Sequence, residues 1–371
     1  MDIGVPKEIK IHEYRVGMTP SSVRELVSQG HRVYVEKDAA LQIGFENQDY
    51  INAGAVVEED PEVIWAKADL IVKVKEPQPI EFNRLRSDQV LFTYLHLAPD
   101  RIQADALMSS GCTAIAYETV TEPSGGLPLL APMSIVAGRM SIQCGAHFLE
   151  ISKGGRGQLL GGVPGVPPAK VVIFGGGSVG TSAARMAMGL GASVSILDLN
   201  TKKLYDLDNT FGPNLKTVYP NIDLVEELVS EADLVVGAVL VPGAPAPCVV
   251  TEKLIKEMNR GSVLVDVSID QGGCFETSKS TTHDSPTYIV HDVVHYCVTN
   301  MPGAVARTST LALNNATLPY VTKITNLGWK EFMRKDSNFA EGLNVWQGKI
   351  IHNEVALALD EKPFDLRRVL N

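Results

Sequence analysis

The sequence predicts an α/β protein with two Rossmann-like domains, each built on a doubly wound parallel sheet, the first domain discontinuous and the two joined by long apolar helices. Short, almost continuously apolar runs alternate with helical patterns over the 371 residues, as is typical of strands covered on both faces. One such run, Val171–Phe174, is followed by a glycine turn, and there the alternation of strands and helices starts a second series. Long helical patterns precede and follow this second series.

The first series of strands and helices occupies residues 1–128. Ile3–Val5 is predicted as a strand, and Thr19 with Pro20 has the pattern of a helix cap followed by a first-turn proline. Gly30 is expected to end that helix, and Arg32–Glu36 to form the next strand. Further strands are predicted at Ala68–Lys75, Gln89–His96 and Thr113–Tyr117.

A long helical pattern runs from Ser134, the predicted N-cap, to Ser152. Because its apolar residues lie almost all round, we expect this helix to be buried between domains or against another subunit. A similar pattern runs from Ala304 to Leu327, with the same expectation. Between the two, strands are predicted at Val171–Phe174, Ser193–Leu197, Ala232–Gly237, Ser262–Asp270 and in a run that ends near Val298.

The glycine turn has the features of a dinucleotide site. Gly175 turns the chain, Gly177 allows backbone N–H groups to approach a pyrophosphate, and Gly180 lets the helix pack close to its strand. The helix N-terminus that follows is expected to supply the positive end of the helix dipole to the phosphates. Asp198 follows at the end of the next strand, where a carboxylate accepts hydrogen bonds from a ribose 2′-hydroxyl and repels a 2′-phosphate. An ordinary strand-to-helix turn would not require this acid, so NAD is the predicted cofactor.

This motif predicts a division of the chain into two functional domains. Residues 129–306 form the NAD-binding domain, and residues 1–128 plus 307–371 form a discontinuous substrate domain. The cleft between the two is expected to hold the chemistry.

Composition limits the classes of partner. Lys and Arg number 33 against 43 Asp and Glu, a net charge of −10, which argues against nucleic acid. No apolar segment is long enough to span a bilayer, and the N-terminus begins with a strand-like run, so a cytoplasmic protein without membrane partners is expected. The five cysteines show no metal-binding spacing. His291 and His295 are expected to share one strand face in a structural role, so no metal site is predicted.

Four residues are candidates for chemistry. Lys75, His96 and Asp270 close predicted strands, and ligands of parallel sheets bind beyond the carboxyl ends of strands. Arg15 lies in the loop after the first strand. Taken singly, each has an ordinary alternative: a solvated lysine, a structural histidine, a surface arginine. Together they supply two cations for a carboxylate, a histidine that titrates near neutrality and an aspartate beside the nicotinamide, which suits oxidation of a small amino or hydroxy acid.

The chain also resembles the L-alanine dehydrogenases over essentially its whole length. The resemblance is carried by motifs that begin at Ile3 (IGVPKE), Tyr14 (YRVGMTP), Val72 (VKVKEP), Phe92 (FTYLHLA), Leu127 (LPLLAPMS), Gly161 (GGVPGV), Ile269 (IDQGGCFET) and Asn300 (NMPGAV). It implies NAD-dependent conversion of L-alanine to pyruvate and ammonium, and the reverse, in a homohexamer. It further implies that Arg15 and Lys75 bind the substrate, and that His96 and Asp270 are the acid and base groups, without assigning each proton transfer.

The same resemblance implies which residues line the NAD site. Beyond the glycine turn with Ser178 and Val179, they are Ser134, Asp198, Lys203, Val239, Leu240, Val267, Ser268, Ile269, Asp270, Lys279, Val298, Thr299, Asn300 and Met301. Three positions depart from the family pattern. Ile135 replaces a common acid, Pro220 a common serine and Cys248 a frequent lysine. Because proline has no hydroxyl donor, these departures are expected to affect cofactor affinity and to leave the reacting end intact.

Two other functions remain open from the sequence. A transhydrogenase-type NAD(H)-binding subunit would work with membrane and NADP-binding partners, but it would not need the four candidate residues. A catalytically silent NAD-binding scaffold would bind the cofactor without turnover.

Overall fold

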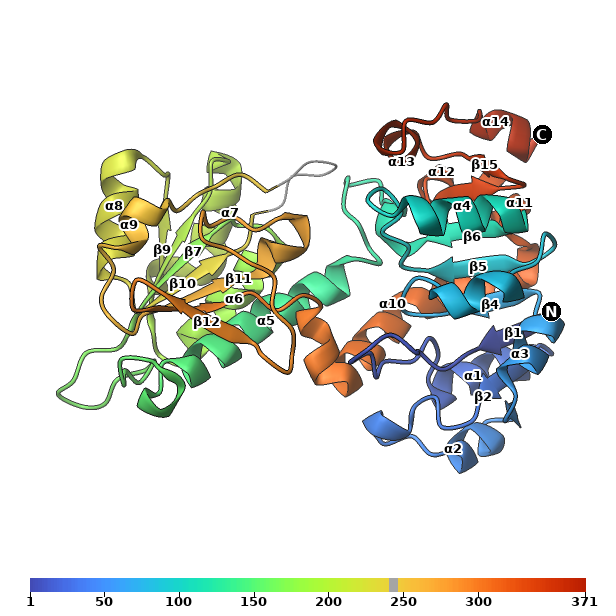
Figure 1. The fold of residues 1–371 in the computed structure, drawn as a ribbon, viewed down its shortest axis with the longest axis horizontal. Helices are drawn as coiled ribbons and strands as arrows, with labels where there is room; N and C mark the ends of the chain where they lie inside the picture. The colour runs from blue at the N-terminus through green and yellow to red at the C-terminus, as the bar shows by residue number, and fades with distance from the viewer. Residues whose placement is uncertain (240–245) are drawn as a thin grey trace. The chain divides into compact units, whose positions relative to one another are not determined.

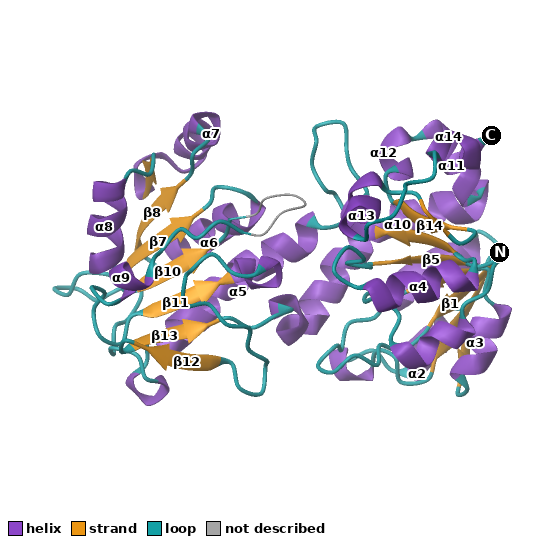
Figure 2. Ribbon diagram, turned by 45° about the horizontal axis from the view of Figure 1, so that its top comes forward, coloured by secondary structure: helices purple, strands orange, loops and turns teal. Residues whose placement is uncertain are grey.

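The structure, a computed structural model, describes residues 1–239 and 246–371. These residues form two compact units, Met1–Met133 with Val305–Asn371 and Ser134–Ala304. Each unit is an α/β fold with helices on both faces of a mostly parallel sheet (Figure 1, Figure 2). The chain enters and leaves the second unit once, so the first unit is discontinuous.

The first unit contains an eight-stranded sheet in the order β15-β14-β6-β5-β4-β1-β2-β3. Its first six strands in sequence pair in parallel, with β1 at the centre; β14 runs antiparallel to β6, and β15 to β14. The bounds are β1 (Asp2–Val5), β2 (Arg32–Glu36), β3 (Val56–Glu58), β4 (Leu70–Val72), β5 (Val90–Thr93), β6 (Thr113–Ala116), β14 (Leu343–Trp346) and β15 (Lys349–Ile350).

The helices of the first unit are α1 (Pro20–Ser28), α2 (Asn47–Asn52), α3 (Pro61–Lys67), α4 (Arg101–Ser110), α10 (Ala306–Leu327), α11 (Trp329–Lys335), α12 (Ser337–Ala340), α13 (Asn353–Ala358) and α14 (Leu366–Leu370). The predicted cap of α1 is confirmed, because the Thr19 side chain accepts a hydrogen bond from the Ser22 N–H and Pro20 opens the helix. Gly30 follows its end with a φ of +86°.

The second unit contains a seven-stranded sheet in the order β12-β13-β11-β10-β7-β8-β9. The chain runs outward from β7 through β8 to β9 and then returns to pair β10 with β7, so the order reverses between β7 and β10. The bounds are β7 (Lys170–Phe174), β8 (Ser193–Leu197), β9 (Leu215–Val218), β10 (Leu234–Gly237), β11 (Val263–Asp266), β12 (Thr287–Val290), β13 (Val293–Tyr296), α5 (Ala131–Phe148), α6 (Ser178–Gly189), α7 (Thr201–Phe211), α8 (Ile222–Glu231) and α9 (Glu252–Ile255).

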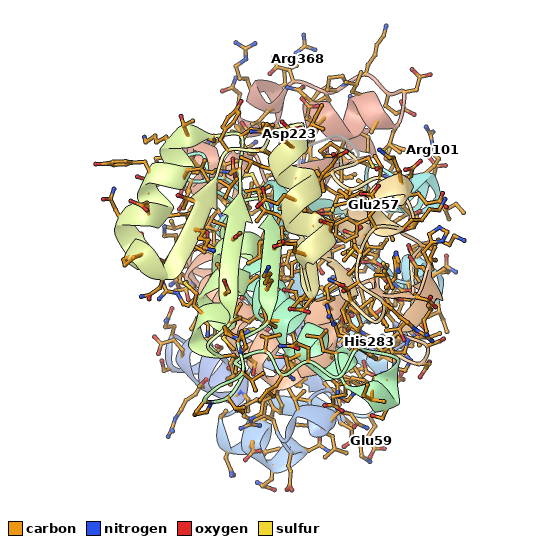
Figure 3. The ribbon with its side chains drawn as sticks, turned by 90° about the vertical axis from the view of Figure 1, so that its left-hand side faces the viewer. Glu59, Arg101, Asp223, Glu257, His283 and Arg368 are labelled. Carbon is orange, nitrogen blue, oxygen red and sulfur yellow. The ribbon has the colours of Figure 1, made fainter. Side chains whose placement is uncertain are left out.

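Burial on both faces explains why these strands are almost continuously apolar. In β7, Val171 and Ile173 belong to one hydrophobic core, while Val172 and Phe174 belong to the core on the opposite face of the sheet. Charged side chains such as Asp223 and Glu257 lie on the surface of this unit (Figure 3). Among the described residues, no helix has the length and apolar character needed to cross a membrane.

Three strands end earlier than the sequence predicted. β4 ends at Val72 instead of Lys75, β5 at Thr93 instead of His96, and β11 at Asp266 instead of Asp270. The cause is the same in each place. A carboxylate takes the backbone N–H groups that strand pairing would otherwise use: Glu8 beyond β4, Glu118 beyond β5 and Asp266 beyond β11.

The helix predicted from Ser134 begins earlier, at Ala131, so Ser134 lies inside the helix and is not its N-cap. The Leu127 carbonyl accepts the Ala131 N–H at 2.9 Å and thereby starts the helical turn, and Pro132 sits in the first turn, where proline is tolerated. The helix is not apolar all round, because Ile135, Arg139, Gln143 and His147 form an exposed stripe at a spacing of four. The other long helix, α10, has polar residues at five of its nine buried positions, Ser309, Thr310, Asn314, Thr317 and Thr325.

The expectation that His291 and His295 share a strand face is wrong. β12 and β13 form an antiparallel hairpin, and His291 and Asp292 are its two turn residues, both with positive φ. His295 is buried in β13 and hydrogen-bonds Thr277, whereas His291 contacts the Glu252 carboxylate.

Candidate active site

Three of the predicted site residues come from neighbouring strands of the first unit. Arg15 lies in the loop after β1, Lys75 in the loop after β4 and His96 in the loop after β5. The three strands are adjacent and parallel, in the order β5-β4-β1, so the three loops leave the same edge of the sheet (Figure 1). The order of strands reverses between β4 and β1, and ligands of α/β sheets bind at such points.

Arg15 is buried, with only 2% of its surface exposed, and is not the surface residue that its loop position suggested. Its Nε and Nη2 each donate to one oxygen of Glu13 at 2.6 Å, a two-pronged ion pair, and its Nη1 lies 3.0 Å from the Met133 sulfur. Glu13 therefore fixes the plane of the guanidinium at this edge of the sheet.

Lys75 is half-buried, and its backbone is held from two sides. Its N–H donates to Glu8, which also accepts the Val74 N–H, and its carbonyl accepts the Thr93 hydroxyl at 2.9 Å. Burial lowers the pKa of Lys75, and the positive charge of Arg15 lowers it further.

A buried ion cluster lies behind this loop. Lys73 is fully buried, and its ammonium contacts Glu8 at 3.1 Å and Glu81 at 3.0 Å. Burial by itself would lower the pKa of Lys73, but attraction to the two carboxylates outweighs it and raises the pKa. Glu8 thus joins a buried charge to the backbone that carries Lys75.

His96 is exposed and adopts a left-handed backbone conformation, with a φ of +46°. Its N–H donates to Glu118 at 2.6 Å, and its ring stacks on that of Tyr94 with centroids 5.8 Å apart and planes 11° from parallel. Tyr94 is buried, and its hydroxyl donates to the Leu129 carbonyl. The imidazole is thus nearly parallel to a buried aromatic ring, in an offset stack.

The glycine turn of the second unit has the geometry that its sequence predicts. Gly175 has a φ of +100°, which only glycine adopts easily. A Cβ on Gly180 would stand 1.8 Å from the Gly175 carbonyl oxygen, so α6 can approach its strand only because residue 180 lacks a side chain. A Cβ on Gly177 would meet nothing within 4 Å, which leaves room beside the N-terminus of the twelve-residue α6.

Asp198 stands directly after β8 and faces this turn. Its carboxylate accepts the Gly176 N–H at 2.7 Å and the Asn200 N–H at 2.8 Å, and the Lys203 ammonium lies 3.9 Å away. The turn follows β7 and lies against the end of the neighbouring strand β10: a Cβ added to Gly175 would stand 2.4 Å from the carbonyl oxygen of Ala238, the residue after β10. The strand order reverses between β7 and β10, so the turn lies at the switch point of the sheet. The arrangement fits the adenosine ribose and pyrophosphate of a dinucleotide.

Most of the remaining predicted cofactor residues lie in the loops after β10, β11 and β13. The Ser268 hydroxyl donates to the Val239 carbonyl at 2.7 Å, which links the loops after β10 and β11. Asp270 lies in a 3₁₀ turn, Val267–Gln271, whose Ser268 N–H donates to Asp266. The Lys279 N–H donates to the Tyr288 hydroxyl. Val298–Met301 follow β13, Ser134 lies in α5, and Leu240 lies outside the described residues.

The three departures from the family pattern lie at the surface or in loops. Ile135 is 41% exposed on α5, Pro220 follows β9, and the Cys248 thiol donates to the Val250 carbonyl at 3.5 Å.

The structure therefore brings Arg15, Lys75 and His96 together in one unit, and Asp270 with the cofactor residues in the other. The carboxylates that hold the backbone or side chains of these residues were not among the predicted site residues, and neither was the buried Lys73; they are Glu8, Glu13, Glu118 and Asp266. Glu118 could have been found, because it comes directly after the predicted strand Thr113–Tyr117, at a strand end like that of His96.

The parallel sheet, the glycine turn and Asp198 define an α/β protein of the dinucleotide-binding class. Residues 4–137 match the family model of the alanine dehydrogenase/PNT N-terminal domain, and residues 141–353 match that of the C-terminal domain. The chain belongs to the alanine dehydrogenase/PNT family.

Relatives and solved structures agree with this assignment. The chain is 58% identical to an alanine dehydrogenase of Halomonas elongata over 96% of both chains, and 52% identical to one of Mycolicibacterium smegmatis over 97% of both. A solved L-alanine dehydrogenase superposes with a TM-score of 0.94 at 54% identity, covering 97% of this chain and 99% of the other. A transhydrogenase from Sinorhizobium meliloti has a TM-score of 0.83 at 24% identity, covers 95% of this chain and 100% of the other, and shows the shared fold.

Proposed function

We propose that the protein catalyses the NAD-dependent oxidative deamination of L-alanine to pyruvate and ammonium, and the reverse reductive amination. The observation that carries this proposal is the assembly of Arg15, Lys75 and His96 at one sheet edge, in a chain more than half identical to alanine dehydrogenases over nearly its full length. The first unit binds the substrate in this account, and the second binds NAD.

The residues of the second unit fit the cofactor. The open turn at Gly177 and the α6 N-terminus would take the pyrophosphate, and the Asp198 carboxylate would accept hydrogen bonds from a ribose hydroxyl. A free 2′-hydroxyl suits a carboxylate, so NAD is favoured over NADP. When bound, the nicotinamide ring supplies the hydride acceptor.

The first unit would hold the amino acid by its carboxylate. Arg15 and Lys75 supply two positive charges, and Glu13 offsets one of them, which leaves a net attraction for one carboxylate. Lys75 would also polarise the carbonyl oxygen of pyruvate in the reverse direction. Burial lowers the pKa of Lys75 most and the positive charge of Arg15 lowers it further, and a bound anion would oppose the effect of Arg15.

The reaction requires proton transfers that suit His96 and Asp270. The substrate ammonium group loses a proton, a hydride leaves Cα, and an iminium forms. Water adds to the iminium carbon, and loss of ammonia, which is protonated to ammonium, gives pyruvate. The balance is L-alanine, NAD⁺ and water to pyruvate, ammonium, NADH and one proton. Two groups that exchange protons would each contribute rate factors of about 10² to 10⁴.

A steady-state assay tests this proposal. Purified protein should reduce NAD with L-alanine, and should do so much more slowly with D-alanine or L-serine, or when NADP replaces NAD. Binding of NAD without turnover of any amino acid would instead favour the silent scaffold. Copurification with an NADP-binding membrane protein would favour the transhydrogenase-type subunit.

The pKa of Lys75 predicts how pyruvate affinity depends on pH. Below its lowered pKa the ammonium is charged and the affinity is constant; above it the charge is lost and the dissociation constant rises up to about tenfold per pH unit. The dissociation constant should begin to rise at a pH below about 10.4, the ordinary pKa of a lysine side chain. The measurement is the dissociation constant of pyruvate for the NADH complex without ammonium, from pH 7 upward.

A Lys75→Arg variant provides the control for this titration. Because arginine stays charged over this pH range, the pyruvate dissociation constant of the variant should be independent of pH. It should be larger than that of the wild type, since arginine differs from lysine in shape. A wild-type pyruvate dissociation constant that does not change as the pH is raised past the ordinary pKa of lysine would contradict the proposed role of Lys75.

We also propose a cytoplasmic homohexamer, as the family resemblance implies. The exposed apolar side chain of Ile135, 41% exposed on α5, is consistent with contact with another subunit. Light scattering at micromolar concentration should give about six times the chain mass of 40.1 kDa. A monomer would rule this assembly out.

A further inference from the structure

Glu118 has no assigned role, yet it lies next to the proposed acid–base histidine. It stands directly after β6, in the 3₁₀ turn Tyr117–Thr119, and β6 pairs in parallel with β5. The loop that carries His96 leaves β5 at the same edge of the sheet. The Glu118 side chain thus crosses from one strand end to its neighbour.

The contacts of Glu118 go to the backbone around His96 and not to its ring. One carboxylate oxygen accepts the His96 N–H at 2.6 Å, and both oxygens lie 3.2 Å from the Leu95 nitrogen, whose N–H they accept. The Leu95 carbonyl accepts the side-chain amide of Gln103 from α4 at 2.9 Å. The half-buried Glu118 and the buried Gln103 therefore hold the N–H and the carbonyl of Leu95, the residue before His96.

This segment needs such support because of its conformation. His96 has a φ of +46°, a region sparsely populated by residues other than glycine and held only where the surroundings impose it. The conformation sets the direction of the imidazole, which lies flat against Tyr94. Hydrogen bonds to a carboxylate are about twice as strong as those between neutral groups, so Glu118 is well suited to impose it.

We propose that Glu118 is a positioning residue for His96, acting through two backbone hydrogen bonds that hold the left-handed turn and aim the imidazole at the substrate. This inference rests on the proposed function, because His96 has a reacting partner only if an amino acid is bound. Glu118 itself transfers no proton in this account; its carboxylate acts as a hydrogen-bond acceptor.

The test compares Glu118→Ala with Glu118→Gln. Alanine removes the acceptor, so kcat should fall by about 10- to 100-fold, the loss typical of a misplaced reacting group, while the NAD dissociation constant stays unchanged. Glutamine keeps an acceptor oxygen at the same reach, so kcat should stay within about tenfold of wild type. Hydrogen exchange of a peptide spanning residues 94–97 should accelerate strongly in the alanine variant and weakly in the glutamine variant.

Asp69 provides the matched control. Its carboxylate also accepts a backbone N–H, that of Asp2 at 2.8 Å, but at the opposite, amino edge of the same sheet. Asp69→Ala and Asp69→Asn should leave kcat and exchange at residues 94–97 unchanged.

Two results would overturn the inference: wild-type kcat with unchanged exchange in Glu118→Ala, or a loss in Glu118→Gln as large as in Glu118→Ala, which would make charge the operative property. If the wild-type protein fails to oxidise L-alanine, the proposed function fails, and the exchange measurement still decides whether Glu118 holds the turn.

Discussion

Replacing His96 with alanine should lower kcat for L-alanine oxidation by about 10² to 10⁴, the range expected for loss of a proton-transferring group. The NAD dissociation constant should not change, because the proposed cofactor residues lie in the other unit. The free energy of unfolding should change little, since the imidazole is exposed. Steady-state kinetics, NAD titration and thermal unfolding measure the three quantities.

His31 is the matched control for this variant. It lies before β2, at the amino edge of the same sheet, and its ring hydrogen-bonds Asn326 at 3.1 Å. His31→Ala should keep wild-type kcat. A loss of less than tenfold in His96→Ala would remove His96 from the reaction.

Replacing Gly180 with alanine should damage both the fold and the cofactor site of the second unit. The new Cβ would stand 1.8 Å from the Gly175 carbonyl oxygen, and both backbones must move to relieve this overlap. Overpacking of this kind costs about 1–3 kcal/mol of unfolding free energy. The same movement would displace the turn proposed to bind the pyrophosphate, so NAD affinity should fall by about tenfold or more.

Two other glycines separate these effects. A Cβ on Gly189, at the end of the same helix, meets nothing within 4 Å, so Gly189→Ala should keep NAD affinity and stabilise by about 0.5–1 kcal/mol. Gly177→Ala also meets no protein atom, but its methyl group would stand where the phosphates approach. It should keep stability within about 0.5 kcal/mol and lose NAD affinity. Unchanged affinity in both Gly177→Ala and Gly180→Ala would place the dinucleotide elsewhere.

The sequence predicted the two parallel sheets and the glycine turn because both depend on local patterns. Strands buried on two faces must be apolar along their length, as in Val171–Phe174, and the close approach at Gly180 tolerates only glycine. The position of Thr19 before Pro20 likewise specified a helix start that the structure confirms.

The strand ends and the support of the site could not be predicted in the same way. β4, β5 and β11 stop where Glu8, Glu118 and Asp266 accept their backbone N–H groups, and these contacts join residues far apart in sequence or hidden in a turn. The left-handed conformation of His96 occurs together with such a contact, from its N–H to Glu118. The burial of Lys73 likewise depends on two carboxylates that no local pattern pairs with it.

The most direct test of the account is to follow the hydrogen on Cα. The protein is incubated with NAD and L-alanine deuterated at Cα, and the products are analysed by mass spectrometry. We predict that each NADH carries one deuterium and is accompanied by one pyruvate and one ammonium. NADH without the label, or no NADH from a protein that binds NAD, would contradict the proposed dehydrogenase.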